Sequence, residues 1–146
     1  MLKRPNLVEV FFVIVGGMKP LFRKADAIVV KVQSLDEGLK FYRDALGHQL
    51  LWRNETMAAM SMGESDTELV LSIGAGPETD ILVESVDDAV IRIKRAGGEV
   101  AEGPNDIPVG RVAVVKDPFG NYLTLVDLSK GRFETNKSGD VVGVKS

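Results

Sequence analysis

The chain has 146 residues and no cysteine; 45% of its residues are hydrophobic, 27% are charged, and its net charge is −3. These proportions exclude a disordered, collagen-like or coiled-coil chain, and the length suits one domain or two small modules that share a core. Lysine and arginine are scattered, which predicts no nucleic-acid partner, and the lack of cysteine excludes disulfides and thiolate metal sites. We expect a cytoplasmic protein.

Residues 1–23 are predicted to be a leader or an extra strand. Two basic residues precede an apolar stretch at 7–15 and a glycine pair, which loosely resembles a signal peptide. The apolar stretch is too short to span a bilayer, so we expect no membrane partner. Its alternating valines are equally typical of a strand, and Met18 is a third possibility, as the natural start.

A strand, a helix and three further strands are predicted next. Residues 25–32 are β-branched and alternate, as a half-buried strand does. Ser34 and Glu37 form a capping box, and apolar residues follow at helical spacing as far as Gly47. Three strand-like stretches complete this first module, at 49–53, 57–62 and 68–73.

The same order then begins again. Alternating residues at 79–83 precede a second cap at Ser85, a helical pattern and a glycine pair at 97–98. Strands are predicted at 99–102, 110–116 and 122–127, with a turn at 117–121 between the last two. Val32 corresponds to Val83, an offset of 51 residues, so the chain is predicted to be a tandem duplication.

The predicted fold class is α+β, with two βαβββ modules in one structural domain. The modules occupy residues 24–74 and 75–130, and residues 131–146 are expected to form a C-terminal tail without regular structure. One helix per module covers only one face of its strands. The uncovered faces are therefore expected to form a curved mixed sheet around a cavity, with the helices outside.

Three segments resemble the vicinal-oxygen-chelate superfamily, the fold of glyoxalase I, bleomycin-resistance proteins and extradiol dioxygenases. They are VQSLDEGLKFYRDALG at 32–47, VESVDDAVIRIKRAGGEV at 83–100 and DPFGNYLTLVD at 117–127. The resemblance covers residues 24–128. It implies paired βαβββ modules and a small-molecule site in the cup. It also implies a homodimer, although the choice between a closed monomer and a module-swapped dimer stays open.

The resemblance also implies where a divalent metal would bind, through His, Glu, His and Glu side chains. At those positions this chain has Ala27, Val70, Glu78 and Thr124. Alanine and valine have no donor atom and a threonine hydroxyl is a weak ligand, so no metal or other cofactor is predicted. A one-residue shift would bring in Asp26 or Glu68 but would turn them toward the helices, and metal binding through unusual ligands stays open.

Several residues are candidates for the cup. Glu78 and Asp80 lie two apart on one strand and point the same way, so Glu78 is the candidate general base and Asp80 a candidate ligand-binding residue. Both could instead lie in solvent after the preceding Gly-Pro linker. The other ligand-binding candidates, each with a structural or surface alternative, are Lys31, Trp52, Arg111, Tyr122 and Thr124.

Three functions are compatible with these patterns. The first is a metal-free protein that binds a small cationic or amphipathic molecule, as bleomycin-resistance relatives do. The second is a lyase, isomerase or dioxygenase, either with unusual metal ligands or with Glu78 as base. The third, less favoured by a short single-domain chain, is a regulatory domain. Fold alone does not choose between them.

Overall fold

The computed structural model describes residues 19–146. Residues 1–18, on which most of the leader or extra-strand expectation falls, lie outside the described part. Residues 19–23 form neither helix nor strand and lead directly into the first strand. The Arg92 guanidinium donates a hydrogen bond of 2.9 Å to the Lys19 carbonyl, which attaches this segment to the second module.

Both predicted modules form, in the predicted order. The first comprises β1 (Lys24–Lys31), α2 (Leu35–Leu39), the π-helix η1 (Lys40–Ala45), β2 (Leu50–Arg53), β3 (Met57–Met60) and β4 (Glu68–Ser72). The second comprises β5 (Glu78–Leu82), α3 (Val86–Arg95), β6 (Glu99–Ile107), β7 (Gly110–Lys116) and β8 (Tyr122–Val126). The strand β6 extends five residues past its predicted end at 102 and contains register shifts in its pairing with β7.

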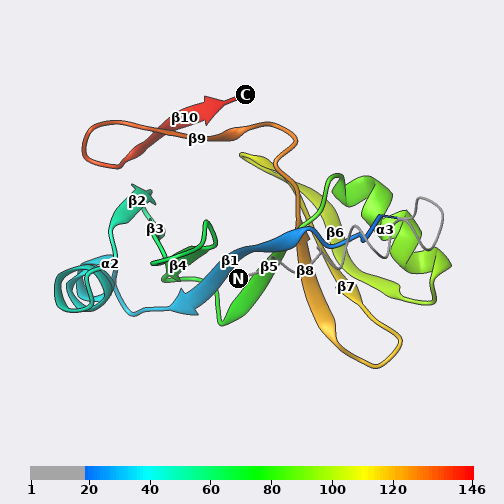
Figure 1. The fold of residues 1–146 in the computed structure, drawn as a ribbon. Helices are drawn as coiled ribbons and strands as arrows, with labels where there is room; N and C mark the ends of the chain where they lie inside the picture. Colours follow the sequence, from blue (N-terminus) through cyan, green and yellow to red (C-terminus); the bar gives the residue numbers. More distant parts are fainter. Residues whose placement is uncertain (1–18) are drawn as a thin grey trace, which may run out of the picture.

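The two modules share one eight-stranded sheet, in the order β2-β3-β4-β1-β5-β8-β7-β6 (Figure 1). The join is an antiparallel pairing of β1 with β5. Within each module the opening and closing strands run parallel, β1 with β4 and β5 with β8. The predicted mixed α+β architecture is therefore confirmed, and both modules meet within a single chain.

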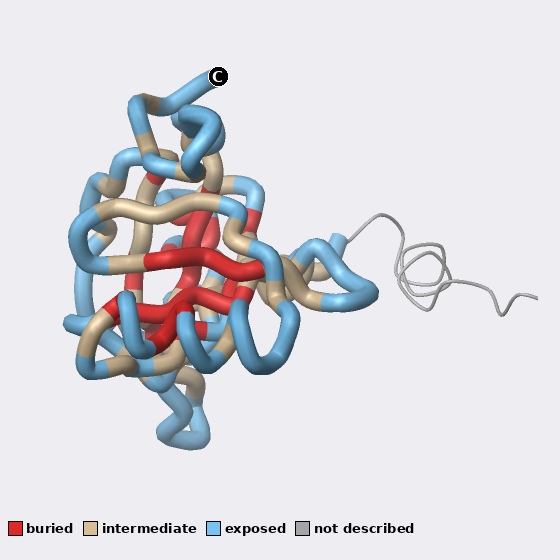
Figure 2. The backbone as a smooth tube through the Cα atoms, turned by 90° about the vertical axis from the view of Figure 1, so that its left-hand side faces the viewer, coloured by how far each residue is buried: buried red, intermediate tan, exposed pale blue. Residues whose placement is uncertain are grey.

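The helices pack on one face of this sheet, where two apolar cores form. One core packs α2 against β3 and β4 and includes Leu35, Leu39 and Leu71; the other packs α3 against β7 and β8 and includes Val86 and Leu125. Figure 2 shows that the buried backbone is concentrated in the central strands. A smaller apolar cluster, which includes Ala27 and Val70, lies on the opposite face.

Both predicted caps form, but the first helix departs from its pattern. Ser34 Oγ accepts a hydrogen bond from the Glu37 amide at 3.1 Å, and Ser85 does the same for Asp88 at 3.2 Å. After Leu39 the turns widen, so that the Leu46 amide donates to the Phe41 carbonyl five residues back. Wider turns shift the side chains that follow around the helix axis, and Leu46, the last residue of the predicted apolar spacing, is 54% exposed. No helix within residues 19–146 is long and apolar enough to cross a membrane.

Residues 131–146, expected to be an irregular tail, form a hairpin of β9 (Arg132–Thr135) and β10 (Val141–Lys145). The hairpin, orange to red in Figure 1, crosses from the second module toward β2. The Arg53 amide donates to the Gly139 carbonyl at 2.8 Å, which joins the hairpin to the edge of the first module. The expectation of a tail failed because this segment is ordered by contacts with a distant strand, which have no local pattern.

Asp127 fixes the end of β8 to two other elements. Its side chain is 2% exposed and accepts hydrogen bonds from the amides of Val86, Arg111 and Ser129 and from the Ser129 hydroxyl. Burial opposes its ionisation, but these donors outweigh that effect and lower the pKa of Asp127. The same carboxylate thus holds the start of α3 and the start of β7.

We expect Asp127→Ala to lower the free energy of unfolding by roughly 2–4 kcal/mol, because several buried N–H groups would lose their acceptor. Urea unfolding at pH 7 measures this change. Asp140→Ala, at an exposed hairpin position, is the matched control and should change stability by less than about 0.5 kcal/mol. Equal effects for the two variants would contradict the anchoring role of Asp127.

Candidate functional site

A cavity of about 420 Å³ lies on the face of the sheet opposite the helices. Its floor is formed by Ala27, Val29 and Val70, which form an apolar cluster with Ala59, and Trp52 and Met57 pack against this cluster. Carboxyl groups, aromatic rings and two basic side chains surround this floor. The full lining is Lys24, Asp26, Ala27, Val29, Trp52, Met57, Asp66, Glu68, Val70, Ala75, Glu78, Asp80, Ile107, Pro108, Val109, Val126, Leu128, Arg132 and Phe133.

The strand register places one carboxyl group on each side of the Ala27 methyl group. Ala27 on β1 pairs with Glu68 on β4 and with Asp80 on β5. Neighbouring strands lie about 4.8 Å apart, so the two acidic residues are attached roughly 10 Å from each other. Glu68, Ala27 and Asp80 thus form a row across three strands. Because the alanine side chain is small, a ligand group has room between Glu68 and Asp80.

The structure corrects one step of the sequence argument. Glu68 was expected on the helix side, yet it is two residues from Val70 and therefore shares its face. Asp26 also reaches the cavity, because β1 has a register shift between Ala25 and Ala27 where it pairs with β5. A bulge of this kind adds a residue and redirects its side chain. Four carboxyl groups on the central strands thus line the cavity: Asp26, Glu68, Glu78 and Asp80.

Asp80 is the most perturbed of these groups. Burial, a hydrogen bond with Glu78 and the negative charges of Glu78 and Asp26 together raise the pKa of Asp80 to about 8, and burial is the largest of these causes. Its Oδ1 atom is buried and has no hydrogen-bond partner in the described part of the chain. At neutral pH the Asp80 carboxyl therefore holds a proton, and it has one oxygen free to bind a ligand.

Trp52, predicted to be a ligand-binding residue, lies in the cavity wall. Its indole Nε1 donates to both oxygens of Glu68, at 3.1 and 3.3 Å. Burial raises the pKa of Glu68, and the indole hydrogen bond partly opposes that shift. The Trp52 ring also contacts Phe133 of the hairpin, with 4.7 Å between the ring centroids. The cavity consequently has an aromatic wall beside its acidic row.

Two basic side chains line the same cavity. Lys24 Nζ forms an ion pair of 2.6 Å with Asp66 Oδ2, which lowers the pKa of Asp66 through that hydrogen bond. Arg132 comes from β9 and lies close enough to lower the pKa values of Asp26 and Glu68 through its charge, although burial dominates both shifts and raises them. Sequence reasoning did not find Arg132 or Phe133, because no local pattern links the hairpin to the cup.

The predicted site residues divide into two groups. Glu78, Trp52 and Asp80 line the cavity, together with Ala27 and Val70. The other candidates lie outside the lining: Lys31 is exposed at the end of β1, Tyr122 is 64% exposed under Lys116, and Thr124 pairs with Asp80 without reaching the cavity. Arg111 is held on the surface by Asp87 and Asp106, at 3.1 and 3.0 Å.

The residues at the expected metal positions do not fit a divalent ion. Ala27 and Val70 have no donor atom, and only Glu78 and Thr124 remain. Within residues 19–146 no three histidine or acidic side chains converge on one point. Catalytic metal sites need about three protein ligands around one ion, and this donor set does not supply them.

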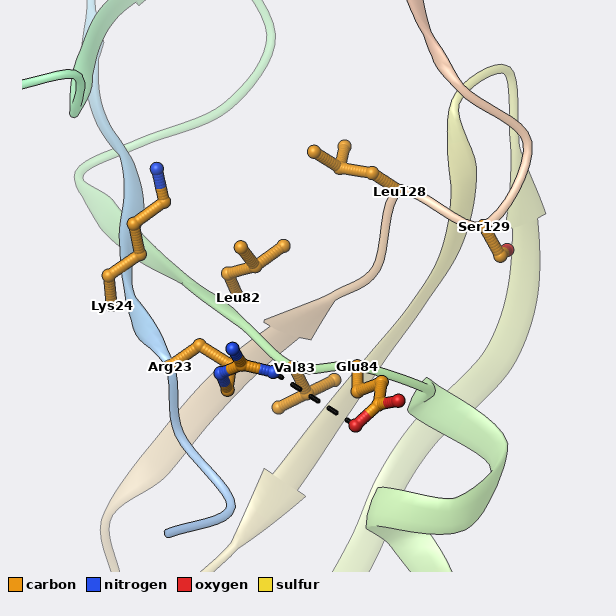
Figure 3. Close-up of a pocket in the computed structure, with 7 residues that line it drawn as sticks. All are labelled: Arg23, Lys24, Leu82, Val83, Glu84, Leu128 and Ser129. Atoms are coloured by element: carbon orange, nitrogen blue, oxygen red, sulfur yellow. Dashed lines mark ion pairs between the residues drawn. The ribbon is translucent and has the colours of Figure 1, made fainter. Parts of the chain in front are cut away.

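A second hollow, of about 380 Å³, lies beside the end of β5 (Figure 3). Arg23 and Glu84 form a long ion pair of 4.0 Å across it, and both side chains are more than half exposed. Water screens such a pair, and neither an aromatic ring nor a buried carboxyl group lines this hollow. We therefore assign the candidate site to the cup.

Asp80 should make the fold less stable as pH rises. Its pKa is about 8 in the folded state and close to 3.8 in the unfolded state, so the folded chain retains a proton that the unfolded chain releases. The contribution of this proton to the free energy of unfolding is complete below about pH 4 and is lost as pH rises through about 8. Urea unfolding between pH 5 and about 8.5 should show the decline in wild type and a flatter profile in Asp80→Asn. Glu102→Gln, which replaces an exposed carboxyl group, should keep the wild-type decline of stability with pH. The same decline in Asp80→Asn would contradict the assignment of the raised pKa to Asp80.

Comparison with known proteins identifies the family. The sequence model of the Glyoxalase/Bleomycin resistance protein/Dioxygenase superfamily matches residues 24–125. A lactoylglutathione lyase from Neisseria meningitidis is 26% identical over 123 residues, which cover 70% of this chain and 89% of that protein. A probable chloroplastic lactoylglutathione lyase from Arabidopsis thaliana is 28% identical over 120 residues, and the chain spans only 34% of that relative's length.

Solved structures show the same fold. The methylmalonyl-CoA epimerase of Mycobacterium tuberculosis superimposes with a TM-score of 0.59 at 18% identity, over 73% of this chain and 89% of that one. A variant of homoprotocatechuate 2,3-dioxygenase from Brevibacterium fuscum gives 0.55 at 20% identity, over 75% and 33% of the two chains. Since the family match spans nearly all of both modules, the chain belongs to the glyoxalase, bleomycin resistance protein and dioxygenase superfamily.

Proposed function

We propose that this protein binds a small organic cation with an apolar or aromatic body in the cup, without a divalent metal. The observation that carries the proposal is the row of Glu68, Ala27 and Asp80, in which Asp80 Oδ1 is buried and has no hydrogen-bond partner among residues 19–146. A buried acceptor without a donor is unfavourable, and a ligand ammonium group placed over Ala27 would supply that donor.

The charge of the lining supports a cation. Besides Asp80, which is protonated at neutral pH, four carboxyl groups face two basic side chains: Asp26, Asp66, Glu68 and Glu78 face Lys24 and Arg132. One of those basic groups, Lys24, is already paired with Asp66. The remaining field is negative, so it attracts cations and repels anions.

The uncharged part of the lining supports an apolar ligand body. Trp52 and Phe133 provide ring faces beside the carboxylates, where a cation gains further stabilisation from the aromatic quadrupole. Ala27, Val29 and Val70 form an apolar floor. A mostly apolar pocket with a few polar groups is the usual form of a small-molecule site.

An enzyme of the same superfamily is the alternative, and the raised pKa of Asp80 favours it. A carboxyl group that titrates near neutral pH beside a second carboxylate, Glu78, is suited to proton transfer. The related proteins are named lactoylglutathione lyases. A glutathione conjugate carries carboxylate groups, however, and the negative lining would oppose its binding. The expected homodimer and cytoplasmic location stay predictions.

Binding of benzylammonium, benzyl alcohol and benzoate tests the charge preference at constant size. Trp52 is the only tryptophan and lines the cavity, so its fluorescence reports binding. Benzylammonium should bind at least roughly tenfold more tightly than benzyl alcohol, because charge-assisted hydrogen bonds are the stronger kind, and benzoate should not bind. Benzoate binding equal to that of benzylammonium would overturn the proposal.

Asp80 should make this affinity depend on pH. A primary ammonium group stays charged below about pH 9, so the affinity for benzylammonium should rise between pH 6 and about 8.5 as Asp80 loses its proton. Asp80→Asn should remove this rise, and it should weaken binding by roughly tenfold at about pH 8.5, where wild-type Asp80 is ionised. Glu102→Gln, outside the cavity, is the control and should behave as wild type.

Two measurements separate the alternatives. Elemental analysis of protein purified without added metal should find no stoichiometric divalent ion; a stoichiometric ion lost in Glu78→Gln would overturn the metal-free proposal. Conversion of lactoylglutathione, followed by chromatography, should be absent. Turnover that Glu78→Gln and Asp80→Asn each reduce by 10²-fold or more, about the size expected of acid–base catalysis, would favour the enzyme instead.

A further inference from the structure

The β9–β10 hairpin connects the two walls of the cup. At its base the Lys130 amide donates to the Val109 carbonyl of the second module at 2.9 Å. At its far end the Arg53 amide of the first module donates to the Gly139 carbonyl at 2.8 Å. The hairpin therefore runs from the second module toward β2 (Figure 1), and its residues Arg132 and Phe133 line the cavity.

The hairpin is lightly attached to the rest of the fold. No residue of the segment 131–146 is buried, and its aromatic contact with the sheet in the described part of the chain is the one between Phe133 and Trp52. Segments with few buried contacts open locally at low free energy. At the base, Gly131 has φ of +125°, a conformation that favours glycine, so the chain can turn sharply where the hairpin leaves the module.

Arg132 has a position in the cavity but no close partner there. Its charge acts on Asp26, Asp66 and Glu68. Among residues 19–146 it nevertheless forms no ion pair within 4.0 Å. A guanidinium attracted by several carboxyl groups and fixed by none of them can be displaced more easily than a bidentate pair.

We propose that the hairpin is a gate over the cavity, and that Arg132 is the tethered counter-ion of Asp26, Asp66 and Glu68, which an entering cation displaces. In the closed state Phe133 covers Trp52 and Arg132 reduces the negative field. Entry of a cationic ligand moves the hairpin away from β2, and the ligand charge replaces that of Arg132. The counter-ion role rests on the proposed cation binding, whereas the gate does not.

A reversible cross-link tests the gate. Arg53 and Asp140 are bridge partners across the junction with β2, and paired residues have Cα atoms about 5 Å apart, within disulfide range. Because the chain has no cysteine, Arg53→Cys/Asp140→Cys contains only this thiol pair. Acrylamide, a neutral quencher, should quench Trp52 roughly threefold less in the oxidised protein than after reduction, since the cross-link prevents opening. Equal quenching in both redox states, with circular dichroism unchanged, would overturn the gate.

Arg132→Gln tests the counter-ion. Without the guanidinium, quenching of Trp52 by caesium should increase about twofold relative to acrylamide, and benzylammonium should bind roughly fivefold more tightly at low salt. Lys137→Gln removes the same charge from the exposed hairpin turn and should have little effect. Equal effects of the two variants would overturn the counter-ion role. If wild type does not bind benzylammonium, the proposed function fails, and the caesium measurement still decides the role of Arg132.

Discussion

The antiparallel pairing of β1 with β5 is the constraint on which the rest of the structure depends. It joins two modules, each with one uncovered face, into a single sheet whose uncovered faces form one cup. The register of this pair also sets the chemistry of the cup, because it places Asp80 opposite Ala27 and Glu78 opposite Val29. The parallel partner β4 then adds Glu68 on the other side of Ala27.

The duplication preserved the fold but not the symmetry of the site. At matching positions of the repeat, β1 carries Ala27 and Val29, whereas β5 carries the carboxyl groups of Glu78 and Asp80. Both kinds of surface border one cavity, so the cup combines an apolar floor with an acidic wall. Burying Asp80 disfavours its charged form and raises its pKa, which is unfavourable for a purely structural residue at neutral pH. A binding or proton-transfer role accounts for that position better than packing does.

Sequence patterns predicted much of the scaffold and part of the site. The capping serines, the module order and the bounds of β7 follow from local rules, because caps and strand alternation depend on neighbouring residues. The same alternation placed Glu78 and Asp80 on one face, and both line the cavity, as does Trp52, which was proposed as the only tryptophan. Glu68 could have been found, since it shares the face of Val70, but its position beside Ala27 depends on the pairing of two strands 40 residues apart. The widening of the first helix left no signal in its apolar spacing.

By itself, then, the sequence determined the repeated βαβββ plan and the family, since both depend on residue type and short-range spacing. It also determined that Ala27 and Val70, at metal positions that the family resemblance implies, have no donor atom. Only the tertiary structure decided which carboxyl groups meet, how far burial perturbs Asp80, and that the last residues form a hairpin over the cup. These features arise from contacts between segments distant in the chain. Their free energy depends on burial and on the local electrostatic field, which local periodicity does not encode.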